Sequence, residues 1–123
     1  MKVLYFAEPI PDILCTGEKR STFRVGDRQD IREGDDISLR LLDDIEFARV
    51  CCTGTKKTTF ENLTEEDWIR HERFANEKEM LATYSNWEQR EVLMNDSLKI
   101  IRFDYDWFDP EPLRKYYNPE HIY

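Results

Sequence analysis

Residues 17–24 (Gly-Glu-Lys-Arg-Ser-Thr-Phe-Arg) bring cationic and hydroxyl side chains together in one short segment. Because side chains alternate between the two faces of a strand, an extended segment places Arg20, Thr22 and Arg24 on one face. Lys19 reaches the same region from the preceding turn. Ammonium, guanidinium and hydroxyl groups bind polar or anionic ligands through strong hydrogen bonds. The segment therefore predicts either a ligand site or a charged strand face that contacts only solvent.

The residues before this segment predict how it is positioned. Ile10, Ile13 and Leu14 recur at helical spacing, which predicts a short helix. Gly17 follows, and glycine readily adopts the left-handed conformation that ends many helices. On the opposite face of the expected strand, Phe23 is apolar and predicts contact with a core. The cationic segment is thus expected to begin where a helix ends and to continue as a half-buried strand.

The cysteines and histidines favour neither a disulfide nor a metal centre. The three cysteines are odd in number, and the adjacent Cys51 and Cys52 would point to opposite faces of a strand. His71 and His121 lack a third ligand at a fixed spacing, and no serine-histidine-aspartate arrangement occurs. We therefore expect no metal, no cofactor and free thiols of the kind found in the reducing cytoplasm.

Length and charge limit the function classes. The 123 residues suffice for one domain with one hydrophobic core. No apolar run approaches the ~20 residues of a membrane helix, and the apolar segment 1–7 is too short for a signal peptide. The net charge of −8 opposes binding to a long polyphosphate. Residues 17–32 nevertheless form a basic patch, which Lys56 and Lys57 would extend if their strand lies nearby. This distribution favours a small ligand or a short single-stranded nucleic acid over a long duplex, and we expect no membrane partner.

The rest of the chain alternates apolar and polar residues as strands do, and then changes to helical spacing. We expect strands at 36–43, 46–53, 55–60 and 97–105, and helices from Thr64 onward and over 76–93. Gly54 predicts a bulge or a bend between two of these strands. On the second helix Met80, Tyr84 and Trp87 share one face, which predicts either core packing or an aromatic cage around a base.

The spacing of four residues resembles the signature of the ASCH domain, a branch of the PUA-like β-barrels: Gly17, Lys19, Thr22 and Arg24. Three further segments also resemble that family: Gly34-Asp35, 52–57 and 60–64. The resemblance covers residues 1–106 and implies an α+β fold, a small mixed or antiparallel β-barrel with helices packed outside. Residues 107–123 lie beyond it, and we expect them to form an extended tail that packs on the domain or extends from it.

One ASCH subgroup is an amidohydrolase that removes the acyl group from cytidine acylated on its exocyclic amine. Its lysine and threonine lie in the motif and its glutamate lies downstream, which implies Lys19, Thr22 and Glu72 as catalytic residues. Glu61 is the alternative glutamate. The ligand contacts that we expect beside them are Arg20, Arg24, Lys56, Lys57 and Glu61.

Two acid–base assignments are open for these residues. A hydroxyl nucleophile needs an adjacent base, and a lysine can be that base only when it is neutral. If Glu72 contacts Lys19 directly, the glutamate is instead the base and the Lys19 ammonium stabilises the oxyanion.

Two other function classes are alternatives to hydrolysis. Other members of the ASCH family are RNA-binding modules or ribonucleases, in which basic side chains hold phosphates and an aromatic ring stacks on a base. A protein-interaction module that uses the acidic surface and the aromatic tail is the third possibility.

Overall fold

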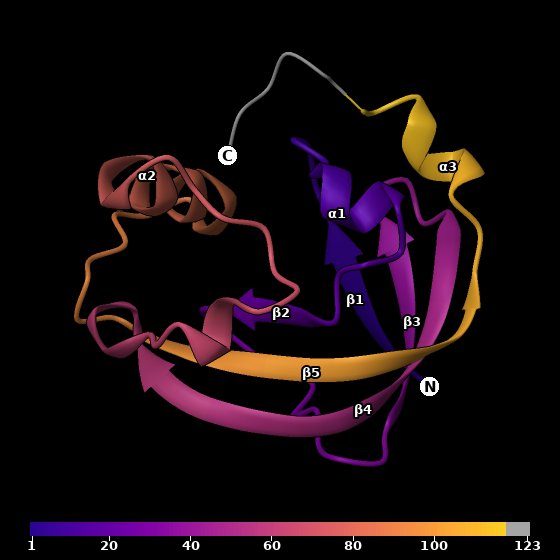
Figure 1. Cartoon of the computed structure of the whole chain (residues 1–123), viewed down its shortest axis with the longest axis horizontal. Helices are drawn as coiled ribbons and strands as arrows, with labels where there is room; N and C mark the ends of the chain where they lie inside the picture. Colours follow the sequence, from indigo (N-terminus) through magenta and orange to yellow (C-terminus); the bar gives the residue numbers. More distant parts are fainter. Residues whose placement is uncertain (118–123) are drawn as a thin grey trace.

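Two long antiparallel strands, β4 and β5, run through the middle of a five-stranded sheet (Figure 1). The computed structural model describes residues 1–117. The elements in chain order are β1 (Lys2–Phe6), α1 (Asp12–Cys15), β2 (Ser21–Arg24), β3 (Asp36–Leu41), β4 (Glu46–Thr59), the 3₁₀ turns η1 (Phe60–Asn62) and η2 (Glu66–Trp68), α2 (Glu77–Glu88), β5 (Ser97–Phe108) and α3 (Glu111–Arg114). The strand order is β1-β3-β4-β5-β2, with β1 parallel to β3 and the other pairs antiparallel. The first two strands of the chain therefore form the two edges of the sheet.

The sheet curls into a half-barrel because the pairing of β4 with β5 is interrupted twice. Register shifts lie between Arg49 and Val50 and between Cys52 and Gly54. An extra residue in one strand bends that strand and increases its twist, and the curl is visible in Figure 1. The bulge predicted at Gly54 is confirmed, but the two strands expected on either side of it form the single strand β4.

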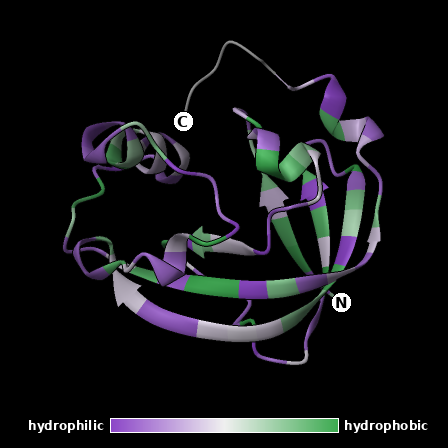
Figure 2. Ribbon diagram, in the orientation of Figure 1, coloured by the Kyte–Doolittle hydropathy of each residue, from purple (hydrophilic) through white to green (hydrophobic). Residues whose placement is uncertain are grey.

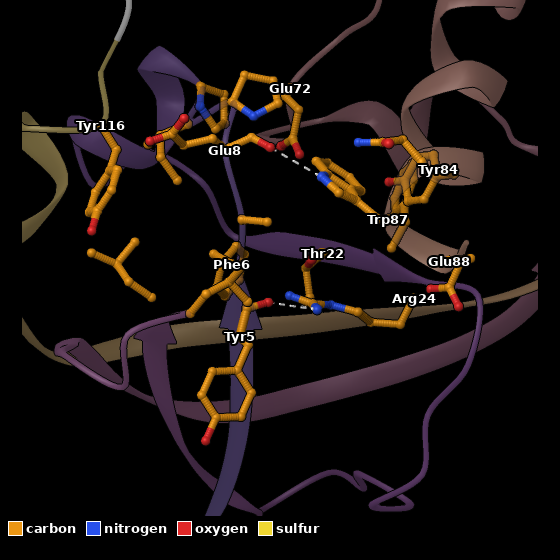
Figure 3. Close-up of a pocket in the computed structure, with 18 of the residues that line it drawn as sticks. Tyr5, Phe6, Glu8, Thr22, Arg24, Glu72, Tyr84, Trp87, Glu88 and Tyr116 are labelled. Carbon is orange, nitrogen blue, oxygen red and sulfur yellow. Dashed lines mark hydrogen bonds between the residues drawn. The ribbon is translucent and has the colours of Figure 1, made fainter. Parts of the chain in front are cut away.

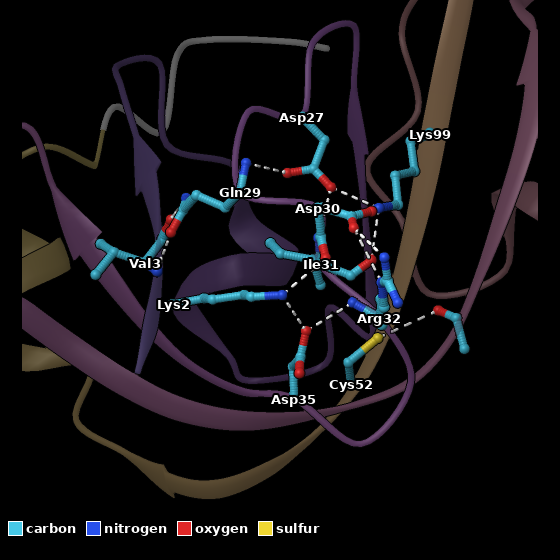
Figure 4. Close-up of polar contacts among 11 residues, drawn as sticks. Lys2, Val3, Asp27, Gln29, Asp30, Ile31, Arg32, Asp35, Cys52 and Lys99 are labelled. Carbon is cyan, nitrogen blue, oxygen red and sulfur yellow. Dashed lines mark hydrogen bonds and ion pairs between the residues drawn. The ribbon is translucent and has the colours of Figure 1, made fainter.

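Side chains cover backbone groups of the edge strand β1. Arg24 on β2 donates from Nη1 to the backbone oxygen of Tyr5 on β1, at 2.9 Å. The side chain of Gln29 accepts from the backbone nitrogen of Val3 at 2.8 Å and donates to the oxygen of the same residue (Figure 4). These contacts occupy backbone groups of β1 that an edge strand would otherwise leave unpaired.

Buried side chains form two clusters along the curled sheet. The larger cluster includes residues from β1, β3, β4 and both short helices, among them Leu14, Leu39, Phe47, Ile101 and Leu113. The smaller one lies beside α2 and includes Phe23, Phe60, Met80, Tyr84 and Ile100. Apolar residues accordingly recur along the strands in Figure 2. The motif segment connects the two clusters along the chain, since α1 before it supplies Leu14 to the larger one and β2 supplies Phe23 to the smaller one.

The helix expected from Thr64 is only the single turn η2. Its predicted cap is present: the Thr64 nitrogen donates to Asp67 Oδ2 at 2.9 Å, and the Asp67 nitrogen donates to Thr64 Oγ1 at 3.4 Å. The turn does not continue because Arg70 has a left-handed φ of 57°. The buried carboxylate of Asp67 also binds Lys56 Nζ on β4, at 2.9 Å. A tertiary ion pair thus overrides the local helical pattern.

The second expected helix is shorter than the interval 76–93. Asn76 is its N-cap, and the side chain of this residue accepts from the Glu79 nitrogen at 2.9 Å. The helix ends at Gln89, whose φ of 56° is left-handed. No helix in residues 1–117 combines the length and the apolar character that a bilayer crossing requires.

The segment expected to be an extended tail, 107–123, is partly regular. Strand β5 continues to Phe108, and the short helix α3 follows after Pro110. Tyr117 then forms an isolated parallel bridge with Ile10. Residues 118–123 lie outside the described part of the chain.

Gly17 provides the first testable prediction. It has a φ of +75°, and a Cβ there would lie 3.2 Å from the ring of Phe108. Gly34 has a φ of +90° with no atom within 4 Å of such a Cβ, so it is a matched control for backbone strain alone. We expect Gly34→Ala to lower the free energy of unfolding by about 1 kcal/mol and Gly17→Ala by about 2 kcal/mol or more. Urea denaturation measures both, and equal losses would mean that the Phe108 contact is unimportant.

Candidate active site

A cavity of about 610 Å³ lies beside both edge strands and the C-terminal end of α2 (Figure 3). One wall is formed by residues 5–11, a second by residues of β2 and a third by residues 84–89. Aromatic rings and charged groups both face this space. A cavity of this volume is in the usual range for small-molecule sites.

The end of α1 positions Lys19. Because Gly17 is left-handed, the chain turns back and the backbone nitrogens of Glu18 and Lys19 both donate to the Ile13 oxygen, at 3.1 and 3.0 Å. The Lys19 side chain is 1% exposed and donates from Nζ to Glu72 Oε2. The predicted helix end therefore delivers a buried ammonium group to the cavity.

Glu72 comes from the irregular segment after η2, 53 residues further along the chain. The Arg20 nitrogen donates to the Arg70 oxygen at 2.9 Å, which holds this segment beside the start of β2. His71 stacks on Phe23 with ring centres 3.8 Å apart, and its Nδ1 donates to the Glu72 backbone oxygen at 2.8 Å. The backbone of Arg70 and the ring of His71 thus hold the segment that carries Glu72 beside Lys19.

Burial sets the ionisation of these groups. It lowers the pKa of Lys19, although the charge and the hydrogen bond of Glu72 act in the opposite direction. Burial alone would raise the pKa of Glu72, but His71 and Lys19 outweigh it and the pKa is lowered. Burial lowers the pKa of His71 to about 3, so that ring is neutral at pH 7 and Lys19 is the cation that keeps Glu72 ionised. Glu72 can therefore accept a proton at neutral pH.

Thr22 supplies a hydroxyl group to the same cavity. It lies on β2 opposite Ile101 of β5 and is 4% exposed. Within residues 1–117 its hydroxyl has no hydrogen-bond partner, and in Figure 3 it points into the cavity. Arg24, two residues further, also lines the cavity and lies over the Phe6 ring at 4.7 Å. The cavity thus contains a free hydroxyl, an ammonium, a carboxylate and a guanidinium.

Three other residues that the sequence indicated as ligand contacts do not line this cavity. Arg20 lies over the Tyr105 ring at 4.7 Å. Lys56 is bound to Asp67, and Lys57 is separated from β2 by the intervening strand β5. Lys56 and Lys57 therefore do not extend the basic patch into this cavity.

Glu61, the alternative glutamate, lines a separate cavity of about 310 Å³ beside Trp68 and Met80. It does not line the cavity that contains Lys19. Of the two carboxylates that the sequence left open, Glu72 is the one that contacts Lys19.

Sequence reasoning missed the N-terminal wall of the cavity. Trp87 on α2 donates from Nε1 to the Glu8 backbone oxygen at 3.2 Å, which ties that wall to the helix (Figure 3). The helical spacing of Tyr84 and Trp87 was a usable signal, since both line the cavity and Tyr84 also packs in the smaller core cluster. No pattern in the proline-rich segment 7–11 indicated that it faces a ligand site.

Within residues 1–117, no three or more histidine, cysteine, aspartate or glutamate side chains are grouped as a metal site requires. We therefore take the cavity as the candidate active site because of its organic side chains: Lys19, Thr22 and Glu72 all line it.

No protein-family model and no curated protein sequence matches the chain. Solved structures with a similar fold include the following two. A protein from Enterococcus faecalis V583, described by the family model DUF984, aligns over 90% of this chain and 72% of its own, with a TM-score of 0.62 and 11% identity. The ASCH domain from Lactobacillus crispatus JV V101 aligns over 84% of this chain and 80% of its own, with a TM-score of 0.53 and 13% identity.

At these identities the similarity concerns the fold. The curled sheet with a few helices around it agrees with the α+β architecture expected from the motif. The predicted fold class is thus confirmed, and the chain has the PUA-like fold of an ASCH domain.

Proposed function

We propose that this domain binds a modified nucleoside in the cavity and hydrolyses the amide bond of an acylated cytidine. The observation that carries the proposal is the buried Lys19–Glu72 ion pair, which lines one cavity together with the free hydroxyl of Thr22. These are the three residues that the ASCH motif implied for catalysis. Nucleophilic acyl transfer requires a hydroxyl and a proton acceptor, and this cavity supplies both.

The cavity suits a nucleoside in size and in chemistry. Its volume of about 610 Å³ is large enough for a base and a sugar. Phe6, Tyr84 and Trp87 supply aromatic surface against which a planar base can pack. The small buried polar set at Thr22 would then face the reacting acyl group.

In the proposed reaction the oxygen of Thr22 attacks the carbonyl carbon of the acyl group, and Glu72 takes the hydroxyl proton. The Lys19 ammonium stabilises the negative charge that develops on the carbonyl oxygen. When the carbon–nitrogen bond breaks, the exocyclic nitrogen receives the proton from Glu72 and cytidine leaves. Water, deprotonated by Glu72, then attacks the ester on Thr22; Glu72 returns that proton to the Thr22 oxygen as the bond breaks, and the carboxylic acid is released.

Direct contact between Lys19 and Glu72 supports this assignment over one in which Lys19 is the base. A lysine held against a carboxylate retains its proton more readily, whereas a lysine base must be neutral. Burial acts against the charged form of Lys19, so the pH dependence of the reaction can separate the two assignments.

Substitution of Thr22 tests the covalent mechanism. Thr22→Val removes the hydroxyl at nearly constant shape and should abolish release of cytidine from acetylated cytidine, whereas Thr22→Ser should retain turnover. Because the hydroxyl has no partner within residues 1–117, Thr22→Val should change the free energy of unfolding by no more than about 1 kcal/mol. Thr53→Val, the same change at an exposed position of β4, is the control. Wild-type turnover by Thr22→Val would show that the hydroxyl is not the nucleophile.

The pH profile tests the roles of Glu72 and Lys19. The pKa of Glu72 is lowered, so protonation should reduce kcat/KM only below about pH 4.5. The pKa of Lys19 is lowered from 10.5, so loss of its charge should reduce kcat/KM on the alkaline side, before pH 10.5 is reached. If neutral Lys19 were the base, kcat/KM would rise over that alkaline range instead. Stopped assays of cytidine release across pH 4–10.5 distinguish a fall from a rise.

A further inference from the structure

Negative charge predominates among the residues that line the cavity. Four carboxylates and two cations line it, which leaves a net charge of −2: Asp43, Glu8, Glu72 and Glu88 against Lys19 and Arg24. The effect of this lining on a charged ligand depends on which of these charges are already paired.

Of the two cations, only Lys19 is held in an ion pair among the described residues. Lys19 is bound to Glu72, and both side chains are at least nine-tenths buried. Arg24 uses Nη1 for the Tyr5 oxygen, and its Nε is buried without a partner among the described residues. Lys19 is therefore committed to Glu72, whereas the charge of Arg24 is offset only by nearby carboxylates, Glu88 among them.

The three exposed carboxylates of the lining differ in their partners. Asp43 accepts from the Tyr116 hydroxyl at 3.0 Å and lies 3.5 Å from Lys115 Nζ. Glu8 and Glu88 are exposed, and within residues 1–117 neither side chain forms an ion pair or a hydrogen bond. They lie on different sides of the cavity in Figure 3. After Arg24 is counted, the lining thus still carries an excess of negative charge around the space that a ligand must enter.

We propose that Glu8 and Glu88 form an electrostatic filter, which admits an uncharged nucleoside and rejects the same nucleoside when it carries a 5′-phosphate. The inference rests on the proposed function and narrows its substrate class from nucleosides and RNA to the unphosphorylated nucleoside. Repulsion between a phosphate and two exposed carboxylates several ångströms away amounts to a roughly tenfold loss of affinity at low salt. Because the carboxylates are exposed, salt screens the repulsion over about 10 Å at 0.1 M.

The filter has a salt dependence opposite to that of a nucleic-acid-binding site. Binding that depends on cationic contacts to phosphates weakens as salt is added. With the filter, the affinity for cytidine 5′-monophosphate should instead increase with salt, while the affinity for cytidine stays nearly constant. The sign of the salt effect therefore separates this proposal from the RNA-binding alternative.

Titration calorimetry with cytidine and cytidine 5′-monophosphate, at about 0.02 M and about 0.5 M salt, tests the filter. In the wild-type protein we expect the monophosphate to bind roughly tenfold more weakly at low salt, and the ratio of the two Kd values to fall toward one at high salt. The Glu8→Gln/Glu88→Gln variant should bring the low-salt ratio close to one. The Glu33→Gln/Glu66→Gln variant makes the same change in net charge at exposed positions outside the cavity, and it should keep the wild-type ratio.

Three outcomes would overturn the filter. The monophosphate could bind as tightly as cytidine to the wild-type protein at low salt, its affinity could fall with salt, or the ratio could persist in Glu8→Gln/Glu88→Gln. If neither cytidine nor acetylated cytidine binds at any salt concentration, the proposed function itself fails and the filter fails with it.

Discussion

The buried ion pair between Lys19 and Glu72 joins two segments that lie 53 residues apart, and the rest of the site depends on this contact. Moving two charges out of water costs several kcal/mol per ion, and an apolar pair of similar size is often as stable or more stable. The surrounding backbone is nevertheless arranged to keep the pair in place. The end of α1 holds Lys19 through the Ile13 oxygen, and the contact from Arg20 to Arg70 holds the segment of Glu72. The backbone thus holds in place an ion pair whose burial costs free energy, which indicates that the pair has a role other than stability.

The cavity exists because the two edges of the half-barrel are bridged by side chains and not by a continuous backbone ladder. Arg24 reaches from β2 to the Tyr5 oxygen on β1, and Gln29 covers the backbone groups of Val3. Trp87 adds a third link, from α2 to the Glu8 oxygen. Side-chain bridges leave space between the edges, whereas a hydrogen-bonded pair of strands at about 4.8 Å would fill it. The side chains that link the two edges of the half-barrel thus also form part of the lining of the candidate site.

The parts of the site that the sequence predicted are those that local geometry determines. The spacing of Thr22 and Arg24 follows from strand alternation, and both line the cavity. Strand order is not a local property, so residue spacing could not show whether Lys57 lies near β2. In the structure β5 lies between the strand of Lys57 and β2. The segment after Thr64 also departs from its helical pattern, because the buried Asp67 binds a lysine on β4. The family resemblance, and not any periodicity, indicated the glutamate that contacts the motif lysine.

The central claim is that the Lys19–Glu72 pair serves chemistry and not stability. The most direct measurement is guanidinium unfolding of the Lys19→Met/Glu72→Leu variant, with acetylcytidine turnover assayed on the same sample. We predict that this variant unfolds at the same or a higher guanidinium concentration than the wild type and has no activity, while Lys19→Met alone is destabilised by about 3–5 kcal/mol because it leaves a buried unpaired charge. A paired variant as unstable as the single one, or one that still turns over substrate, would contradict the account.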